Sequence, residues 1–263
     1  MAMICDSIAC LSDSPQRLQI LDALDDACID LRDLKAELDC PRTTLQRNLS
    51  VLEQYGWVEQ RSSGYATTTA GCLVLAEFVA MNRTVETINA VKPFLDTVDT
   101  PTEIDIGRLD APLITVPEPG RPNAPTKRLF EAFAEADRVQ GFLPFVSSLL
   151  VELAGTDRYV AVEQEYVVSR AGLDALYEQY ADESAAVPGA DRSASHIKIR
   201  SCDDDLPYGL FVSDDRLALA GYDEIGRIKA LVESTGEESI EWGEDTYETY
   251  REGSEPHEKE ILG

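Results

Sequence analysis

The sequence predicts an α/β protein (α+β overall) in two parts, a small helical N-terminal domain and a larger C-terminal domain with a mixed sheet. Within residues 1–68, apolar side chains recur at helical spacing with short breaks. From residue 101 onward, strand-like and helix-like stretches alternate. We therefore place domain 1 at residues 1–68, a linking helix at 69–100 and domain 2 at 101–263.

Three short helices are expected within residues 1–55. Ser14 and Pro15 mark the first, because a serine oxygen can accept an early backbone N–H and proline needs no donor there. Asp30 is placed to cap the second helix. The third runs over about 41–55 and ends at Gly56.

A short hairpin is expected after the third helix. WVEQR and YATTT are strand-like, and they flank a turn at Ser62-Ser63-Gly64. The second and third helices are separated by a turn of about three residues, as in helix-turn-helix units. Three helices followed by a hairpin predict that domain 1 is a winged helix-turn-helix.

The third predicted helix has a polar face opposite its leucines. This face carries hydroxyl, amide and guanidinium groups, the types that contact base edges or phosphates. A merely solvated helix in so acidic a chain would carry Asp and Glu instead. We predict that this helix and the hairpin bind double-stranded DNA through Arg42, Thr43, Thr44, Gln46, Arg47, Ser50, Arg61 and Ser63.

The net charge of −26 restricts how DNA could be bound. Acidic side chains number 11 and basic ones six within residues 1–70, a net charge of −5, so the remaining −21 lies farther along the chain. A broad basic surface is excluded, although phosphate contacts usually dominate affinity for DNA. Acidic surfaces with scarce Lys are typical of salt-loaded, halophilic cytoplasm, where roughly 1 M salt screens repulsion beyond about 3 Å. DNA binding should therefore depend on a few local side chains.

The linking segment and domain 2 follow clear patterns. Residues 70–98 are periodic and largely helical, with a break expected at Pro93. This helix either pairs with its copy in a homodimer or packs on its own domain. The sequence of domain 2 predicts strands at 111–116, 158–163, 196–200, 208–215, 216–223 and 229–234. It predicts helices at 125–137, 144–154, 169–181 and 236–251.

Three stretches resemble one known family. They are VPEPGRPNAPTKRLFEAFAEADRVQGFLPFVS (116–147), LPYGLFVSDDRLALAGYDEIGRIKALVES (206–234) and EWGEDTYETYRE (241–252). These stretches resemble the FilR-type sensor domain of archaeal transcription regulators, which are distant relatives of the TrmB group. The acidic composition resembles versions from halophilic archaea. The resemblance spans nearly the whole chain and implies a one-component regulator whose sensor domain binds a small-molecule effector on a degenerate phospholipase D-like fold.

One pattern could indicate an enzyme instead. His196, Lys198 and Asp203 match the HxK spacing of the phospholipase D fold, in which the His attacks phosphorus and the Lys holds the phosphate. That chemistry normally needs a second copy of the motif, and none with an Asp follows. No Gly-rich phosphate loop or GxSxG elbow is present either. We interpret the match as chance and expect binding without turnover, with no cofactor.

An effector would be held by polar or aromatic groups near strand ends. The candidates are Pro117, Asn123, Phe145, Tyr208, Tyr222 and Asp223. Each of them could equally well be a residue of the core or of a turn.

The cysteines support an alternative, thiol-based regulator. Five of the six lie within residues 1–72, with no CxxC pair and no interleaved His, so a metal site is not expected. Cys40 precedes the third helix, and a helix N-terminus favours the reactive thiolate. Oxidation of Cys40, with Cys28, Cys10 and Cys5 nearby in sequence, would then displace that helix. The competing interpretation is that these thiols are small buried hydrophobes.

A second alternative is a protein-interaction module whose winged helix does not bind DNA. Such a module has no need of Arg42, Arg47 and Arg61 on helix and hairpin. No run of 18 apolar residues and no signal-peptide pattern is found in the sequence, so we expect a cytoplasmic protein without a membrane partner.

Overall fold

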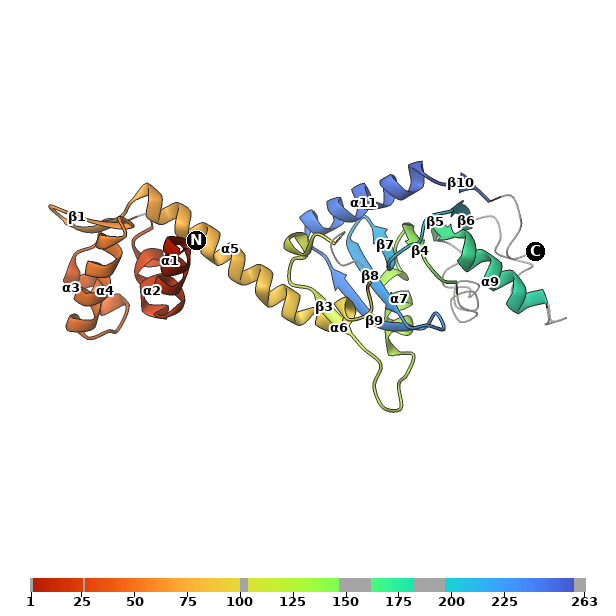
Figure 1. Cartoon of the computed structure of the whole chain (residues 1–263), viewed down its shortest axis with the longest axis horizontal. Helices are drawn as coiled ribbons and strands as arrows, with labels where there is room; N and C mark the ends of the chain where they lie inside the picture. Colours follow the sequence, from red (N-terminus) through yellow and green to blue (C-terminus); the bar gives the residue numbers. More distant parts are fainter. Residues whose placement is uncertain (1, 26, 100–103, 147–161, 182–196, 258–263) are drawn as a thin grey trace. The chain divides into compact units, whose positions relative to one another are not determined.

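The computed structural model describes residues 2–25, 27–99, 104–146, 162–181 and 197–257 (Figure 1). The chain divides into two compact units, Met1–Val85 and Glu86–Gly263. This division falls within the segment 69–100 that the sequence predicts as a link. The first unit is helical with a small hairpin and the second contains a large sheet, which confirms the predicted fold class.

The helices predicted for the first unit are confirmed, with one addition. In chain order its elements are α1 (Ala2–Ser12), α2 (Pro15–Ala23), α3 (Leu31–Glu37), α4 (Arg42–Gln54), β1 (Val58–Arg61), β2 (Gly64–Thr67) and the start of α5 (Thr69–Ala90). The addition is α1, which the sequence did not predict. Its Cys10 and Leu11 are buried in the core of this unit.

Local signals at the helix ends are only partly as expected. The Asp30 carboxylate accepts the amide N–H groups of Arg32 and Asp33 at 2.7 and 2.9 Å, which confirms it as the cap of α3. The predicted side-chain cap at Ser14 is wrong, because its hydroxyl makes no capping bond. Its carbonyl instead accepts the N–H of Arg17. Gly56, with φ +73°, ends α4 in the left-handed conformation that glycine favours.

The hairpin is held against the rest of the first unit by a third short segment. β1 and β2 pair antiparallel from Val58↔Thr67 to Arg61↔Gly64. Ile29, just before α3, exchanges two backbone hydrogen bonds with Tyr65, at 3.0 and 2.8 Å. A Cβ on Gly64 would lie 2.3 Å from the Ile29 carbonyl oxygen, so this close approach requires glycine.

The second unit is built on an eight-stranded mixed sheet with the order β10-β6-β5-β4-β7-β8-β9-β3. β4, β5 and β6 run parallel, and the other neighbours are antiparallel. The strands are β3 (Leu113–Thr115), β4 (Arg138–Leu143), β5 (Glu163–Ser169), β6 (Ile197–Cys202), β7 (Gly209–Ser213), β8 (Arg216–Tyr222), β9 (Ile228–Ser234) and β10 (Glu255–Pro256).

Helices cover both faces of this sheet (Figure 1). Phe94 of α6 (Lys92–Leu95) and Tyr247 of α11 (Glu237–Glu252) are buried in one core with the sheet. Leu129 and Phe133 of α7 (Ala124–Phe133) and Leu173 of α9 (Arg170–Ala181) are buried in a second core. The sheet therefore lies between two helical layers, with an apolar core on each side.

Strands in the second unit differ from expectation in specific places. β4 and β10 were not predicted. β5 begins only at Glu163, the last residue of the strand expected at 158–163, and extends to Ser169; residues 158–161 lie outside the described residues. The strand-like sequence pattern of β4 is interrupted by Gly141. Glycine is required there because a Cβ would lie 1.9 Å from the Leu210 carbonyl oxygen on β7. The helix expected at 144–154 is absent at its first three residues, and 147–154 are not described.

A buried ion pair joins the sheet to α7. The Glu233 side chain on β9 is 2% exposed, and its two oxygens accept Arg128 of α7 at 2.7 and 2.9 Å. Arg216 on β8 donates to the same carboxylate at 3.1 Å. The carboxylate is thereby paired on both oxygens, which a charge taken out of water requires.

Candidate nucleic-acid interface

One face of α4 is free of contacts with the core of its unit. Leu45, Leu49 and Leu52 are buried on the opposite side of the helix. The predicted DNA-binding residues of this helix lie on the free face, with Thr44 partly buried and the others exposed: Arg42, Thr43, Gln46, Arg47 and Ser50. The structure therefore gathers hydroxyl, amide and guanidinium groups on one solvent-facing strip.

Three polar side chains that the sequence did not mark as functional, Asn48, Arg17 and Gln16, hold α4 in place. Asn48, on the buried side of α4, is 1% exposed, and its side-chain Oδ1 accepts a hydrogen bond from Arg17 Nε at 3.3 Å. Its amide donates to Gln16 Oε1 at 3.3 Å. Arg17 also donates to the Cys10 carbonyl at 2.6 Å, so α1, α2 and α4 are joined by one network. Asn48 could have been identified from the sequence, because it is a polar residue three positions after Leu45 and lies among the buried leucines of α4.

The arginines of α4 differ from the arginine of the hairpin in their partners. Within the described residues, neither Arg42 nor Arg47 makes an ion pair or a side-chain hydrogen bond. Arg61 on β1 instead pairs with Glu59, at 2.7 Å from Nη2 and 2.8 Å from Nε. The two guanidinium groups on α4 are thus available to phosphates or guanine edges, whereas that of Arg61 is already engaged.

The other hairpin candidate, Ser63, is also engaged. Its hydroxyl lies 3.1 Å from Cys28 Sγ, a hydrogen bond in which either atom could donate. Cys28 is exposed, so this contact lies at the surface beside the hairpin turn.

Burial separates the cysteines of the redox alternative. Cys40 and Cys10 are buried in the core of the first unit, and Cys40 Sγ lies 3.6 Å from the Pro41 carbonyl oxygen. Cys40 does precede α4, as expected, but the residue is only 5% exposed, so its thiol has little contact with dissolved oxidants. Cys28 is the exposed thiol of the set, and the side chain of Cys5 lies outside the described residues.

Four of the effector candidates meet at one edge of the sheet in the second unit. Phe145 follows β4, Tyr208 precedes β7, and Tyr222 ends β8, with Asp223 after it. The registers Phe142↔Leu210 and Gly209↔Ala220 bring these ends together. The other two candidates lie between β3 and α7, where Pro117 is half-buried and Asn123 is exposed.

The roles of these four residues differ. Tyr208 is 1% exposed and packs against Phe94 and Phe142, so its ring is part of the core. Asp223 accepts the backbone N–H groups of residues 225 and 227 and the Arg227 guanidinium. Burial opposes ionisation of Asp223, but these hydrogen bonds outweigh it and hold the pKa of that carboxyl below its usual value.

Tyr222 has a buried hydroxyl that makes no hydrogen bond within the described residues. Its ring lies 5.9 Å from that of Phe145, which is 39% exposed. Burial, with the nearby Tyr166, raises the pKa of Tyr222 well above its usual value, so the hydroxyl is neutral at physiological pH. A buried donor without a partner is uncommon in folded proteins and calls for an explanation.

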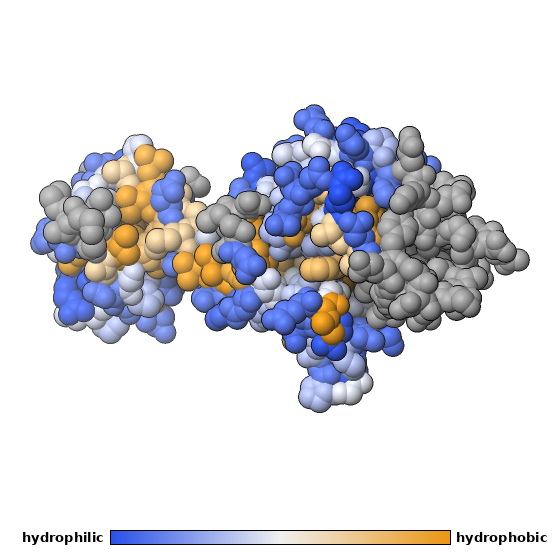
Figure 2. Space-filling view, turned by 45° about the vertical axis from the view of Figure 1, so that its right-hand side comes forward, coloured by the Kyte–Doolittle hydropathy of each residue, from blue (hydrophilic) through white to orange (hydrophobic). Residues whose placement is uncertain are grey.

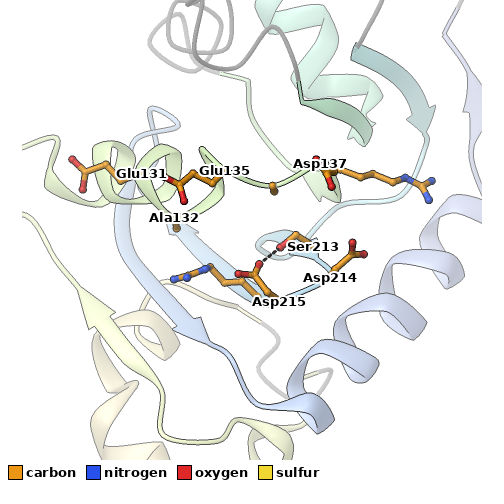
Figure 3. Close-up of a pocket in the computed structure, with 10 residues that line it drawn as sticks. Glu131, Ala132, Glu135, Asp137, Ser213, Asp214 and Asp215 are labelled. Atoms are coloured by element: carbon orange, nitrogen blue, oxygen red, sulfur yellow. Dashed lines mark hydrogen bonds between the residues drawn. The ribbon is translucent and has the colours of Figure 1, made fainter.

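A pocket of about 370 Å³ opens at the opposite edge of the sheet (Figure 3). Glu131 reaches it from α7 and Glu135 from the turn after that helix, Asp137 lies before β4, and Asp214 and Asp215 form the turn between β7 and β8. The Ser213 hydroxyl donates to Asp215 at 2.8 Å. The pocket is therefore acidic, and none of the sequence-predicted effector residues lines it.

The phospholipase D-like pattern is not assembled as a site in the described residues. Asp203 is paired with Arg170, Lys198 is exposed on β6, and His196 lies outside the described residues. No group of three or more potential metal ligands is found in the described ranges. Among the helices that the structure describes, none has the length and apolar character needed to cross a bilayer.

Two family models match the sequence. The model of the methanogenesis regulatory protein FilR1, middle domain, matches residues 122–253, and that of the HVO_A0261 N-terminal domain matches residues 5–90. No curated protein matches.

Three solved structures that this chain resembles are distant in sequence. TrmBL2, described as an archaeal chromatin protein with a novel mode of DNA binding, is 14% identical, with 96% of this chain and 99% of that chain covered and a TM-score of 0.38. A phosphatidylserine synthase of Haemophilus influenzae is 13% identical, with 56% and 39% covered and a TM-score of 0.35. HmgR of Pseudomonas aeruginosa is 14% identical, with 90% and 95% covered and a TM-score of 0.24.

Thiol burial predicts the order in which the cysteines react. In the folded protein, iodoacetamide should modify Cys28 at least about tenfold faster than Cys40, because a buried thiol reacts only when the domain opens. Mass spectrometry of peptides from a time course measures both rates. In urea the two rates should converge. Equal rates in the folded protein would restore Cys40 as an accessible redox site.

Proposed function

The chain belongs to the family defined by the middle domain of the methanogenesis regulatory protein FilR1, and from this we propose that it is a sequence-specific DNA-binding transcription regulator. The observation that carries the proposal is the exposed face of α4 with its two unpaired arginines. In a chain of net charge −26, the exposed side of α4 carries Arg42 and Arg47 and a single acid, Glu53.

The chemistry of this face suits the major groove. A helix of 13 residues is about 20 Å long, and the major groove admits a helix of ordinary width. Arg47 and Gln46 can donate to guanine and adenine edges, and the hydroxyls of Thr43 and Ser50 can donate to phosphates. We propose that α4 is the recognition helix and that the β1–β2 hairpin is the wing.

We further propose that the protein acts as a homodimer through α5. Val74, Phe78, Met81, Val85 and Ile88 alternate at spacings of four and three, the heptad pattern of a coiled coil. Phe78 packs in the core of the first unit, but Met81, Val85 and Ile88 are exposed, and apolar side chains reach the surface along α5 in Figure 2. A second copy of the helix is the partner that this pattern fits.

Charge supports pairing of α5 with its own copy. Met81, Val85 and Ile88 form the exposed seam of α5. The positions that flank this seam are Asn82, Thr84 and Asn89, which carry no charge. Two copies of a strongly acidic chain can approach each other here without like charges meeting at the seam.

We propose that the second unit binds a small-molecule effector at the sheet edge where Phe145 and Tyr222 lie. Ligands of open α/β sheets usually bind beyond the carboxyl ends of the parallel strands, and Phe145 follows β4 at that edge. An acceptor on the effector would satisfy the unpartnered Tyr222 hydroxyl, after displacement of the partly exposed Phe145 ring. We propose binding without turnover, since the described residues bring no nucleophile and base together there.

The first prediction from this proposed function concerns α4. Arg47→Glu should weaken binding to the preferred DNA sequence by at least about a hundredfold, because it removes a donor and adds a charge that phosphates repel. The preferred sequence is first obtained by selection from random duplexes with the wild-type protein. Fluorescence anisotropy then measures the dissociation constants.

The matched control is Arg83→Glu, which makes the same charge change at an exposed site of α5. Binding should stay within about threefold of wild type, and circular dichroism should show both variants folded. Equal behaviour of the two variants would contradict the proposed recognition face and favour a winged helix that binds protein instead.

The second prediction concerns the dimer. Val85→Asp should convert the dimer to a monomer, because two buried carboxylates would face each other in the seam. Val79→Asp is the control, since Val79 is exposed on α5 but one position beyond Phe78 and off the seam. Sedimentation velocity distinguishes the species. A monomeric wild type, or dimers in both variants, would rule out this seam.

The third prediction separates the two possible effector positions. A ligand from a thermal-shift screen should raise the melting temperature of the wild type and of Asp215→Asn but not of Tyr222→Phe. Without ligand, Tyr222→Phe should be at least as stable as wild type, since the hydroxyl it removes has no partner. The reverse pattern would move the effector to the acidic pocket.

A further inference from the structure

The wing carries an ion pair that involves a proposed DNA-binding residue. Glu59 and Arg61 are two positions apart on β1, so their side chains project from the same face of the strand. Arg61 Nε and Nη2 both lie within 2.8 Å of the same carboxylate oxygen of Glu59. The side chains are 53% and 50% exposed, so the pair is open to solvent and can be exchanged.

This pairing distinguishes the wing from the recognition helix. Arg42 and Arg47 have no ionic partner within the described part of the chain, whereas Arg61 is neutralised by its neighbour. A phosphate that binds Arg61 must displace Glu59, and it then lies close to the displaced carboxylate. Contact between the wing and a phosphate therefore has an added electrostatic cost that contact with α4 does not have.

We propose that Glu59 is a specificity-determining residue, which suppresses binding of the wing to non-specific DNA by competing with phosphates for Arg61. The inference rests on the proposed function. On a preferred sequence, α4 is fully engaged and holds the wing against the backbone, so a phosphate displaces Glu59. On other sequences the contacts of α4 are incomplete, and Arg61 stays with Glu59. The pair thus weakens the sequence-independent part of binding, which comes from phosphate contacts.

The Glu59–Arg61 pair should also affect the salt dependence of DNA binding. Neutralising Glu59 frees one cation for a phosphate without altering α4. The number of phosphates neutralised on random DNA should then rise by about one for each protomer, and the salt dependence of binding should steepen accordingly.

The test is a double-mutant cycle with Glu59→Gln, Arg61→Gln and the double variant in the full-length protein. Fluorescence anisotropy measures dissociation constants for a selected duplex and for a random duplex between about 0.1 and 1 M KCl. Glu59→Gln should tighten binding to the random duplex by about threefold to tenfold at the lowest salt. Binding to the selected duplex should tighten less, so the ratio between the two constants falls.

The gain must act through Arg61. In the Arg61→Gln background, Glu59→Gln should change binding by less than about twofold. The control is Glu53→Gln on α4, which removes an exposed acid without an ionic partner within the described residues. Any gain from Glu53→Gln should be the same with or without Arg61.

Three results would overturn the inference: no gain from Glu59→Gln, an equal gain on both duplexes, or a gain that persists in the Arg61→Gln background. If these occur while Arg47→Glu still abolishes binding, only the role of Glu59 fails. If Arg47→Glu binds as wild type does, the proposed recognition face fails, and the inference fails with it.

Discussion

The packing of α4 against its unit is the constraint on which the other features of the interface depend. Three buried leucines fix the rotation of this helix, and Asn48 links it to α1 and α2 through Arg17 and Gln16. This partly buried polar network is favourable in one arrangement only, because a rotated helix would leave the buried Asn48 amide without partners. The free face of α4 is therefore presented in a defined orientation.

Electrostatics then decides how such a face can function in an acidic chain. Most of the negative charge belongs to the chain after position 70, and the first unit has few cations to spare. Arg17 is used inside the unit, Arg61 is paired on the wing, and two arginines on α4 remain unpaired among the described residues. Affinity for DNA would come from few contacts. Pairing of α5 with a second copy would double their number, and Glu59 would weaken the contact of Arg61 with phosphates on non-specific DNA.

Helical patterns in the sequence predicted much of this arrangement, but side-chain partners could not be predicted. The leucine spacing and the turn signals at Asp30 and Gly56 correctly placed α3, α4 and the polar face. α1 was missed because it lacks a capping signal, and β4 because Gly141, needed for the approach of β7, weakens its strand pattern. Burial of Cys40 and Tyr208, and the Arg61–Glu59 pair, depend on tertiary neighbours that a single sequence does not reveal.

The central claim, that a small set of arginines binds DNA, is tested most directly by the salt dependence of the wild-type dissociation constant. Each neutralised phosphate contributes about −0.9 to the slope of log K against log salt. A dimer predicts a slope of about −2 on a selected duplex if only Arg42 of each protomer contacts phosphate, and of about −5 if Arg47 and Arg61 do so as well. A slope of about −10, the mark of a broad basic surface, or a slope near zero would contradict the account.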